Sequence, residues 1–308
     1  MKRKIILAGG TGTMGRILQK HFADQGDEVV VLTRQPRKQD PRARMVQWDA
    51  VNAGAWCNEL EGSDVLINLA GRSVDCRYTA ANRTAILESR VLATRCLGKA
   101  TAQCTLPPRL WINLSSATVY RHAEDRAMDE DSSEPGTDFS PKVVLAWEKE
   151  FFAHADPRIR QVAVRCAMVF ATHGGALPRF VQLVRMGLGG HHGNGRQYVS
   201  WVHEEDVARF LEWLIAAPQV EGIINLAAPN PLPERDLMRL LRERVKHLVA
   251  FNIPEWMVGV GAFFLRTETE LVLKSRRVIP TRAQQLGFRF EFTTMNTALD
   301  DLLKPRTR

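Results

Sequence analysis

The feature that most constrains this chain is a cluster of glycines near its start, between an apolar strand and an apolar helix. Residues 5–8 read Ile-Ile-Leu-Ala, and a helical pattern begins at Met14. Glycine weakens helices and strands alike, so this cluster indicates that something approaches the backbone closely. The usual occupant is a phosphate, because the start of a helix presents unpaired N–H groups and the positive end of its dipole.

The glycines fit two spacings of a dinucleotide-binding turn. Gly10, Gly12 and Gly15 match G-x-G-x-x-G, whereas Gly9, Gly12 and Gly15 match G-x-x-G-x-x-G. The strand before the turn and the helix after it supply the context that such a motif requires. A plain glycine-rich turn is the alternative. We predict a pyrophosphate site made of Gly9, Gly10, Thr11, Gly12, Thr13, Met14 and Gly15.

Strand and helix patterns alternate over the first half of the 308 residues. The expected strands are residues 28–33, 45–49, 64–69, 110–115 and 161–169, and the expected helices are residues 79–102 and 141–154. Ser140 is the expected N-cap of the second helix. This βαβ rhythm predicts an α/β fold with a doubly wound parallel sheet of the Rossmann type.

The rhythm loosens after residue 170. We expect a Rossmann domain over residues 1–170, with a return to the sheet near 204–228. A smaller, mostly helical C-terminal substrate lobe would then comprise residues 171–203 and 229–308. These boundaries imply that the second lobe is interleaved with the first.

Three stretches of the expected lobe carry further expectations. Residues 187–195 hold five glycines, which permit motion, so we expect them to form a mobile part of the cleft wall. Residues 249–253 and 288–292 could pair as strands.

Composition narrows the class of protein. The net charge is +8 and the pI is near 9.5, yet no aromatic-rich basic motif accompanies the charge, so nucleic-acid binding is remote. The longest apolar run near the end, residues 256–265, is too short to span a membrane. The five cysteines are scattered and the chain enters a strand at once, so we expect a cytoplasmic protein with reduced thiols and no signal peptide. The histidines near residues 191 and 192 have irregular spacing, so no metal site is expected.

The end of the second expected strand indicates which dinucleotide binds. An NAD site needs an acidic residue there to hold the ribose 2′-hydroxyl. Here the strand ends in Thr33 and Arg34, and no acid follows until Asp40. A guanidinium matches the geometry of a 2′-phosphate. The sequence therefore favours NADP(H), with a surface arginine as the alternative interpretation.

Several motifs resemble the extended short-chain dehydrogenase/reductase superfamily. They are "GGTGTMG", "NLAG" at Asn68–Gly71 and "NLSSATVY" at Asn113–Tyr120. The stretches "WEKEFF" and "ELVLKSRRVIPTRAQQLGFRFEF" resemble its atypical YfcH-like, epimerase-like branch. The resemblance implies a cytoplasmic Rossmann protein with bound NADP. A homodimer is a further expectation. The implied substrate is a nucleotide sugar or another small polar carbonyl or alcohol.

The same resemblance implies further cofactor contacts outside the glycine turn. Asp49 would lie near the adenine and Val169 near the nicotinamide, whereas Arg90 could equally be a solvated arginine on a helix surface. The implied contacts are Asp49, Leu69, Ala70, Gly71, Arg90, Ser115 and Val169.

The catalytic set of the superfamily is incomplete in this chain. Such enzymes use a serine together with a tyrosine placed four residues before a lysine. Ser115 stands where the serine should be, but the residues four positions after the three tyrosines are asparagine, glutamate and valine. Lys142 and Glu148 are the only ionisable substitutes in the expected place. We therefore name Ser115 and Lys142 as catalytic candidates, with a catalytically weak NADP-bound sensor as the alternative function.

Overall fold

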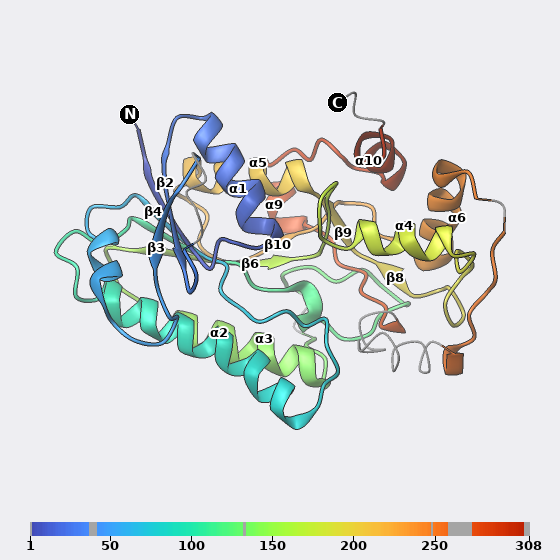
Figure 1. Ribbon diagram of the computed structural model, residues 1–308, viewed down its shortest axis with the longest axis horizontal. Helices are drawn as coiled ribbons and strands as arrows, with labels where there is room; N and C mark the ends of the chain where they lie inside the picture. The colour runs from blue at the N-terminus through green and yellow to red at the C-terminus, as the bar shows by residue number, and fades with distance from the viewer. Residues whose placement is uncertain (1, 37–41, 132–133, 248, 258–272, 305–308) are drawn as a thin grey trace.

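A computed structural model describes residues 2–36, 42–131, 134–247, 249–257 and 273–304. Its centre is a seven-stranded sheet in the order β10-β6-β5-β4-β1-β2-β3, with all neighbours parallel (Figure 1). The strands are β1 (Lys4–Ala8), β2 (Glu28–Thr33), β3 (Arg44–Gln47), β4 (Val65–Asn68), β5 (Leu110–Asn113), β6 (Arg160–Cys166) and β10 (Gly222–Leu226). The order reverses between β1 and β4, where ligands of such sheets bind.

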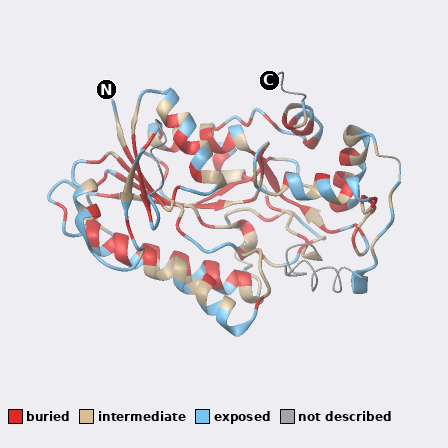
Figure 2. Cartoon of the chain, in the orientation of Figure 1, coloured by how far each residue is buried: buried red, intermediate tan, exposed pale blue. Residues whose placement is uncertain are grey.

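Helices cover both faces of this sheet, which explains why β1, β2, β4 and β5 are mostly apolar. Along β1, Ile5 and Leu7 pack with one set of helices, while Ile6 and Ala8 pack with the other. Figure 2 shows the strands buried between the two layers. The first layer holds α1 (Thr13–Asp24), α5 (Glu204–Ala216) and α9 (Thr281–Gln285), and the second holds α2 (Ala80–Thr101) and α3 (Phe139–Phe152). The predicted doubly wound sheet is thereby confirmed.

A separate hydrophobic cluster lies beyond the carboxyl ends of the strands (Figure 1). Two short strand pairs contribute to this region, namely β7 (Met168–Phe170) with β9 (Trp201–His203), and β8 (Tyr198–Val199) with β11 (Leu232–Pro233). Its helices are α4 (Leu177–Arg185), α6 (Glu234–Val245) and α10 (Met295–Leu302). None of the helices in the described ranges is long and apolar enough to cross a bilayer. The division into two domains at the predicted boundaries stays a prediction.

Several local expectations were wrong. The N-cap of α3 is Asp138, and Ser140 is the second residue of that helix, where it is buried. The single strand expected at 161–169 is interrupted at Ala167. The residues before it form β6 of the large sheet, and those after it form β7, which pairs with β9. Residues 288–292 form no strand, because the N–H groups at 291 and 292 donate to the buried carboxylate of Asp206, both at 2.9 Å.

The glycine-rich stretch 187–195 is anchored. Gly190 and Gly193 donate backbone hydrogen bonds to Phe251 and Ile253 at 3.2 and 2.8 Å. A Cβ at Gly190 would lie 2.5 Å from the carbonyl carbon of Phe251, so glycine here permits close packing. Residues 249–253, expected as a strand, contribute one parallel bridge between Ile253 and His192. The motion expected of this stretch stays a prediction.

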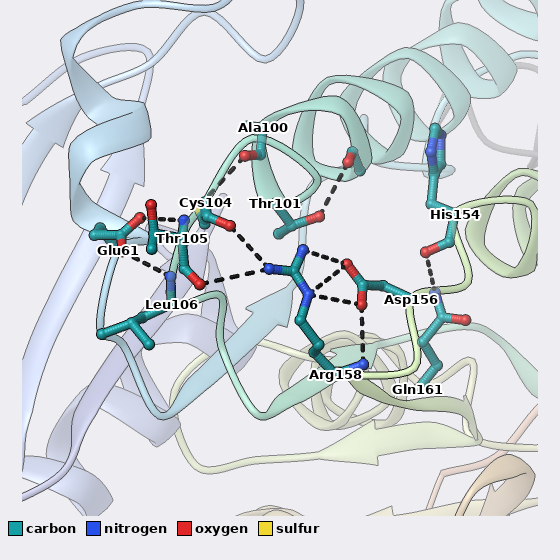
Figure 3. Close-up of polar contacts among 11 residues, drawn as sticks. Glu61, Ala100, Thr101, Cys104, Thr105, Leu106, His154, Asp156, Arg158 and Gln161 are labelled. Carbon is teal, nitrogen blue, oxygen red and sulfur yellow. Dashed lines mark hydrogen bonds and ion pairs between the residues drawn. The ribbon is translucent and has the colours of Figure 1, made fainter.

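The opposite edge of the sheet is held together by polar contacts between the loops that precede β4, β5 and β6 (Figure 3). The guanidinium of Arg158 donates to the carbonyl oxygens of Cys104 and Thr105 at 3.1 and 3.5 Å. Glu61 accepts from the backbone N–H of Thr105 at 3.0 Å. Because these loops lie at the amino ends of the strands, this network supports the fold at the end away from the glycine turn.

Candidate functional site

The glycine turn joins β1 to α1 and packs against the loop after β4. Gly9 has a φ of 80°, and a Cβ added there would lie 2.8 Å from the Cα of Ala70. A Cβ at Gly15 would overlap the carbonyl group of Gly10, where the helix passes over the turn. Gly12 faces open space. Gly9 and Gly15 therefore permit packing, and Gly12 leaves room for a ligand.

The first turn of α1 offers unpaired N–H groups to that space. Its N-cap is Gly12, which has no side chain to accept from them, and no acidic residue stands in the turn. Thr13 and Met14 supply two of these donors, which lack intrahelical partners in any α-helix. From below, the buried Gln19 Nε2 donates to the Gly10 carbonyl at 2.7 Å. The sequence pattern did not reveal this contact, which fixes the turn.

Two arginines flank the turn. Arg34 follows β2 and is exposed, and no described side chain pairs with its guanidinium. Thr33 before it is buried, and its Oγ1 accepts from the N–H of Gln35 at 3.3 Å. Arg16, which sequence reasoning missed, donates to the carbonyl oxygen of Thr11 at 3.2 Å. This edge of the sheet therefore carries free positive charge and no nearby acid from β2.

Asp49 follows β3 at the same edge. Its carboxylate accepts from the N–H groups of Asn52 and Val51, both at 2.8 Å. Hydrogen bonds from Asn52 and Val51 lower the pKa of Asp49 below its usual value. The side chain thus shapes a turn, and its predicted place beside the adenine stays a prediction.

The loop after β4 is held by a buried amide that sequence reasoning missed. Asn68 accepts from the N–H of Ala70 at 3.0 Å through Oδ1. Its Nδ2 donates to Asn113 at 2.8 Å and to Thr94 at 2.9 Å. Leu69 packs against the core on the α1 side. The amide therefore fixes the ends of β4 and β5, from which the predicted contacts Leu69 and Ala70 follow.

Arg90 on α2 is a partly buried cation beneath this loop. A Cβ at Gly71 would lie 3.1 Å from its Cζ, and its guanidinium lies 5.4 Å from the ring of Trp147. It donates to the carbonyl oxygens of Arg72 and Ile86 at 3.1 and 3.0 Å. Burial lowers the pKa of Arg90 to about 10, and no described carboxylate pairs with it. A desolvated cation without a carboxylate partner is typical of a site that binds an anion. This favours Arg90 as a ligand contact over Arg90 as a solvated residue on a helix surface.

Ser115, at the end of β5, belongs to a buried polar network. Its Oγ donates to Glu148 of α3 at 2.7 Å, and Arg165 of β6 forms two hydrogen bonds with that carboxylate, at 3.0 and 2.8 Å. Arg165 also donates to the Tyr120 hydroxyl at 3.2 Å, which in turn donates to Asn225 at 2.9 Å. All five side chains are buried. Four elements of the fold thus converge on the predicted serine.

This network determines whether the hydroxyl of Tyr120 can act as a general base. Burial raises the pKa of Tyr120 above its ordinary value, and its hydroxyl is engaged by Arg165 and Asn225. The phenol is therefore neutral at physiological pH and is a poor general base.

Lys142 lies apart from this network although it shares α3 with Glu148. Lys142 is exposed, whereas Glu148 faces the core and is the partner of Ser115. The guanidinium of Arg83 lies 4.9 Å from the ring of Phe139 in the same region. Lys142 contributes to a pocket of about 670 Å³ lined by Tyr78, Arg83, His122, Thr137, Asp138, Phe139, Lys142, Glu255, Leu273 and Lys274.

The remaining candidates lie in the region beyond the strands. Val169 is in β7, and its carbonyl accepts from the N–H of Ala176 at 3.2 Å; its place beside the nicotinamide stays a prediction. His203 is buried, and its Nδ1 accepts from the N–H of Glu205 as the N-cap of α5. His192 pairs with Glu234 at 2.5 Å. Within the described ranges, no three His, Cys, Asp or Glu side chains gather as metal ligands.

Comparisons with known proteins place this geometry in a family. The chain is 32% identical over 307 residues to the epimerase family protein YfhF of Bacillus subtilis (strain 168), covering 98% of each. A crystal structure of the human epimerase family protein SDR39U1 (isoform 2) with NADPH superposes with a TM-score of 0.85 at 27% identity, covering 97% of this chain and 99% of that one. The nucleoside-diphosphate sugar epimerase of Corynebacterium glutamicum gives 0.79 at 29% identity, covering 98% of this chain and 58% of that longer one.

Two family models match. One, described as a domain of unknown function, matches residues 253–302. The other matches residues 5–227, which include the glycine turn, Arg34, Arg90 and the Ser115 network. The chain therefore belongs to the NAD dependent epimerase/dehydratase family.

Proposed function

We propose that this protein binds NADPH in preference to NADH at the carboxyl edge of its sheet, as an epimerase-like oxidoreductase for a small polar carbonyl or alcohol. The observation that carries the proposal is positive charge along this edge that no described carboxylate neutralises. It comes from the first turn of α1, from the exposed Arg34 and from the partly buried Arg90, which donates to the carbonyl oxygens of Arg72 and Ile86. The NADPH in the structure of the human relative supports the same conclusion.

The residues present fit the dinucleotide. The space above Gly12 admits a pyrophosphate that the N–H groups of Thr13 and Met14 can bind. Arg34 would hold the 2′-phosphate. When bound, NADPH supplies a hydride.

Ser115 would orient the hydroxyl group of the alcohol form of the substrate. Its proton is directed to Glu148, so its lone pairs remain free to accept a hydrogen bond from that hydroxyl group. The carboxylate of Glu148 is in turn held by Arg165.

A second candidate function is an NADPH-bound sensor with little catalysis. Tyr120 is neutral and engaged, and the Tyr–Lys pair is missing from the sequence, which favours this alternative. The NADPH-loaded protein should be assayed for carbonyl reduction and nucleotide-sugar epimerisation. Turnover on the order of 1 s⁻¹ that Ser115→Ala abolishes would support an enzyme. No turnover across both assays, with NADPH bound, would support the sensor.

The Arg34→Glu variant tests the cofactor preference. One charged contact is worth about 1.5–3 kcal/mol, so NADPH should bind roughly tenfold to hundredfold more weakly, while NADH should be affected less. Titration by cofactor fluorescence measures both affinities.

A matched control is Arg185→Glu, which changes another exposed arginine, at the far end of α4, and should leave both affinities unchanged. Equal affinity of the native protein for NADPH and NADH would contradict the proposal.

A further inference from the structure

The segment between β7 and the middle of α4 reaches back to the cofactor half of the molecule at two points. Gly174 has a φ of 91°, and a Cβ added there would overlap the Oγ1 of Thr13, the first residue of α1. Five residues later, Arg179 forms an ion pair with Asp75 in the loop after β4. The hydrogen bond from Arg179 to Asp75 raises the pKa of the arginine. One short segment thus touches both loops that flank the pyrophosphate site.

The base of this segment is fixed. Thr172 donates through its N–H and its Oγ1 to Glu204 of α5, at 3.0 and 2.8 Å. Ala176 donates to the carbonyl of Val169 at 3.2 Å. The start of residues 172–179 is therefore fixed next to the sheet of β7 and β9. The contacts of Gly174 and Arg179 position the rest of the segment.

The strand order shows what lies beneath. β1 and β4 are parallel neighbours, paired from Ile5 with Val65 to Ala8 with Asn68, so the loops after them lie side by side at the carboxyl ends of the strands. A segment that contacts Thr13 on one side and Asp75 on the other therefore bridges these two loops. The first turn of α1, which would hold the pyrophosphate, begins at Thr13.

We propose that residues 172–179 form a strap over the bound dinucleotide, closed by the Arg179–Asp75 pair and by the contact of Gly174 with Thr13. This proposal rests on the proposed function, since it needs NADPH bound at the glycine turn. The strap slows release of the cofactor by blocking its exit, and it does not contact the reacting atoms. Its closing ion pair is partly exposed, with 63% of the Arg179 side chain and 30% of the Asp75 side chain accessible, so its effect on the release rate is moderate.

The first test measures NADPH release by stopped-flow fluorescence after mixing the loaded protein with excess NADP⁺. Arg179→Ala and Asp75→Ala should each release NADPH about fivefold faster, the upper range for an exposed pair. The double variant should be no faster than either single one, because all three break the same contact. Arg239→Ala, which breaks an exposed pair with Glu243 on α6, is the control and should release at the native rate.

The second test uses the other contact. Gly174→Ala should also speed release several-fold, since its side chain would displace the segment from Thr13. Gly287→Ala is the matched control, because Gly287 has a φ of 93° and open space around it, so the backbone strain is the same without the overlap. Native release rates in either Arg179→Ala or Gly174→Ala, or additive acceleration in the Asp75/Arg179 double variant, would overturn the strap. Failure of the native protein to bind NADPH would instead overturn the proposed function on which it rests.

Discussion

Replacing Arg165 with methionine is expected to lower the free energy of unfolding by about 3–5 kcal/mol, because it leaves a buried carboxylate without its cation. Glu148 and Arg165 are 5% and 9% exposed and are joined by two hydrogen bonds. The Ser115 hydroxyl would be the remaining strong partner of Glu148, which is too little to offset desolvation. Urea denaturation of the native and variant proteins measures the difference.

Two further variants distinguish the lost pair from lost packing. Arg165→Met combined with Glu148→Leu should recover most of the stability, since no buried charge remains unpaired. Arg95→Met removes a guanidinium that forms two hydrogen bonds with Glu150 of α3, and there the arginine side chain is 45% exposed. An exposed pair of that kind should cost about 1 kcal/mol or less. A similarly small cost for Arg165→Met would contradict a structural role for the buried pair.

The sequence predicted well those features that depend on residues close together in the chain. The order of strands and helices in the first half, the glycine turn and the return to the sheet at β10 all follow from local apolar patterns and turn chemistry. Arg34 stands directly after β2, as expected, and its contact with a 2′-phosphate stays a prediction. The motifs that resemble the superfamily led to the family that the comparisons show.

The features that were missed depend on residues far apart in the chain. Glu148 stands 33 residues from Ser115 and 17 from Arg165, so no spacing rule joins the three. Asp206 accepts from the N–H groups of residues 291 and 292, about 85 positions away, and so replaces the pairing with residues 249–253 that the sequence suggested. Hydrophobic periodicity reports which face of an element is buried, but it does not report which polar group is buried beside it.

The glycine turn gives the second large effect, in the Gly15→Ala variant. A Cβ there would overlap the backbone carbonyl of Gly10, and a backbone group cannot move aside as a flexible side chain can. The first turn of α1 must therefore shift away from β1, at a cost of about 1–3 kcal/mol in stability for overpacking. The affinity for NADPH should fall by more than about a hundredfold, because several N–H groups of this turn would no longer point toward the pyrophosphate. Chemical denaturation and cofactor fluorescence measure the two losses.

Gly12→Ala separates the role in packing from the role in binding. A Cβ at Gly12 meets no protein atom within 4 Å, and the residue has an ordinary φ of −79° as the N-cap of α1. Stability should therefore fall by less than about 1 kcal/mol. The methyl group would instead occupy the space that the pyrophosphate needs, so NADPH affinity should fall by at least about tenfold. Native affinity in Gly12→Ala, beside a large loss in Gly15→Ala, would show that the open space above the turn is not where the cofactor lies.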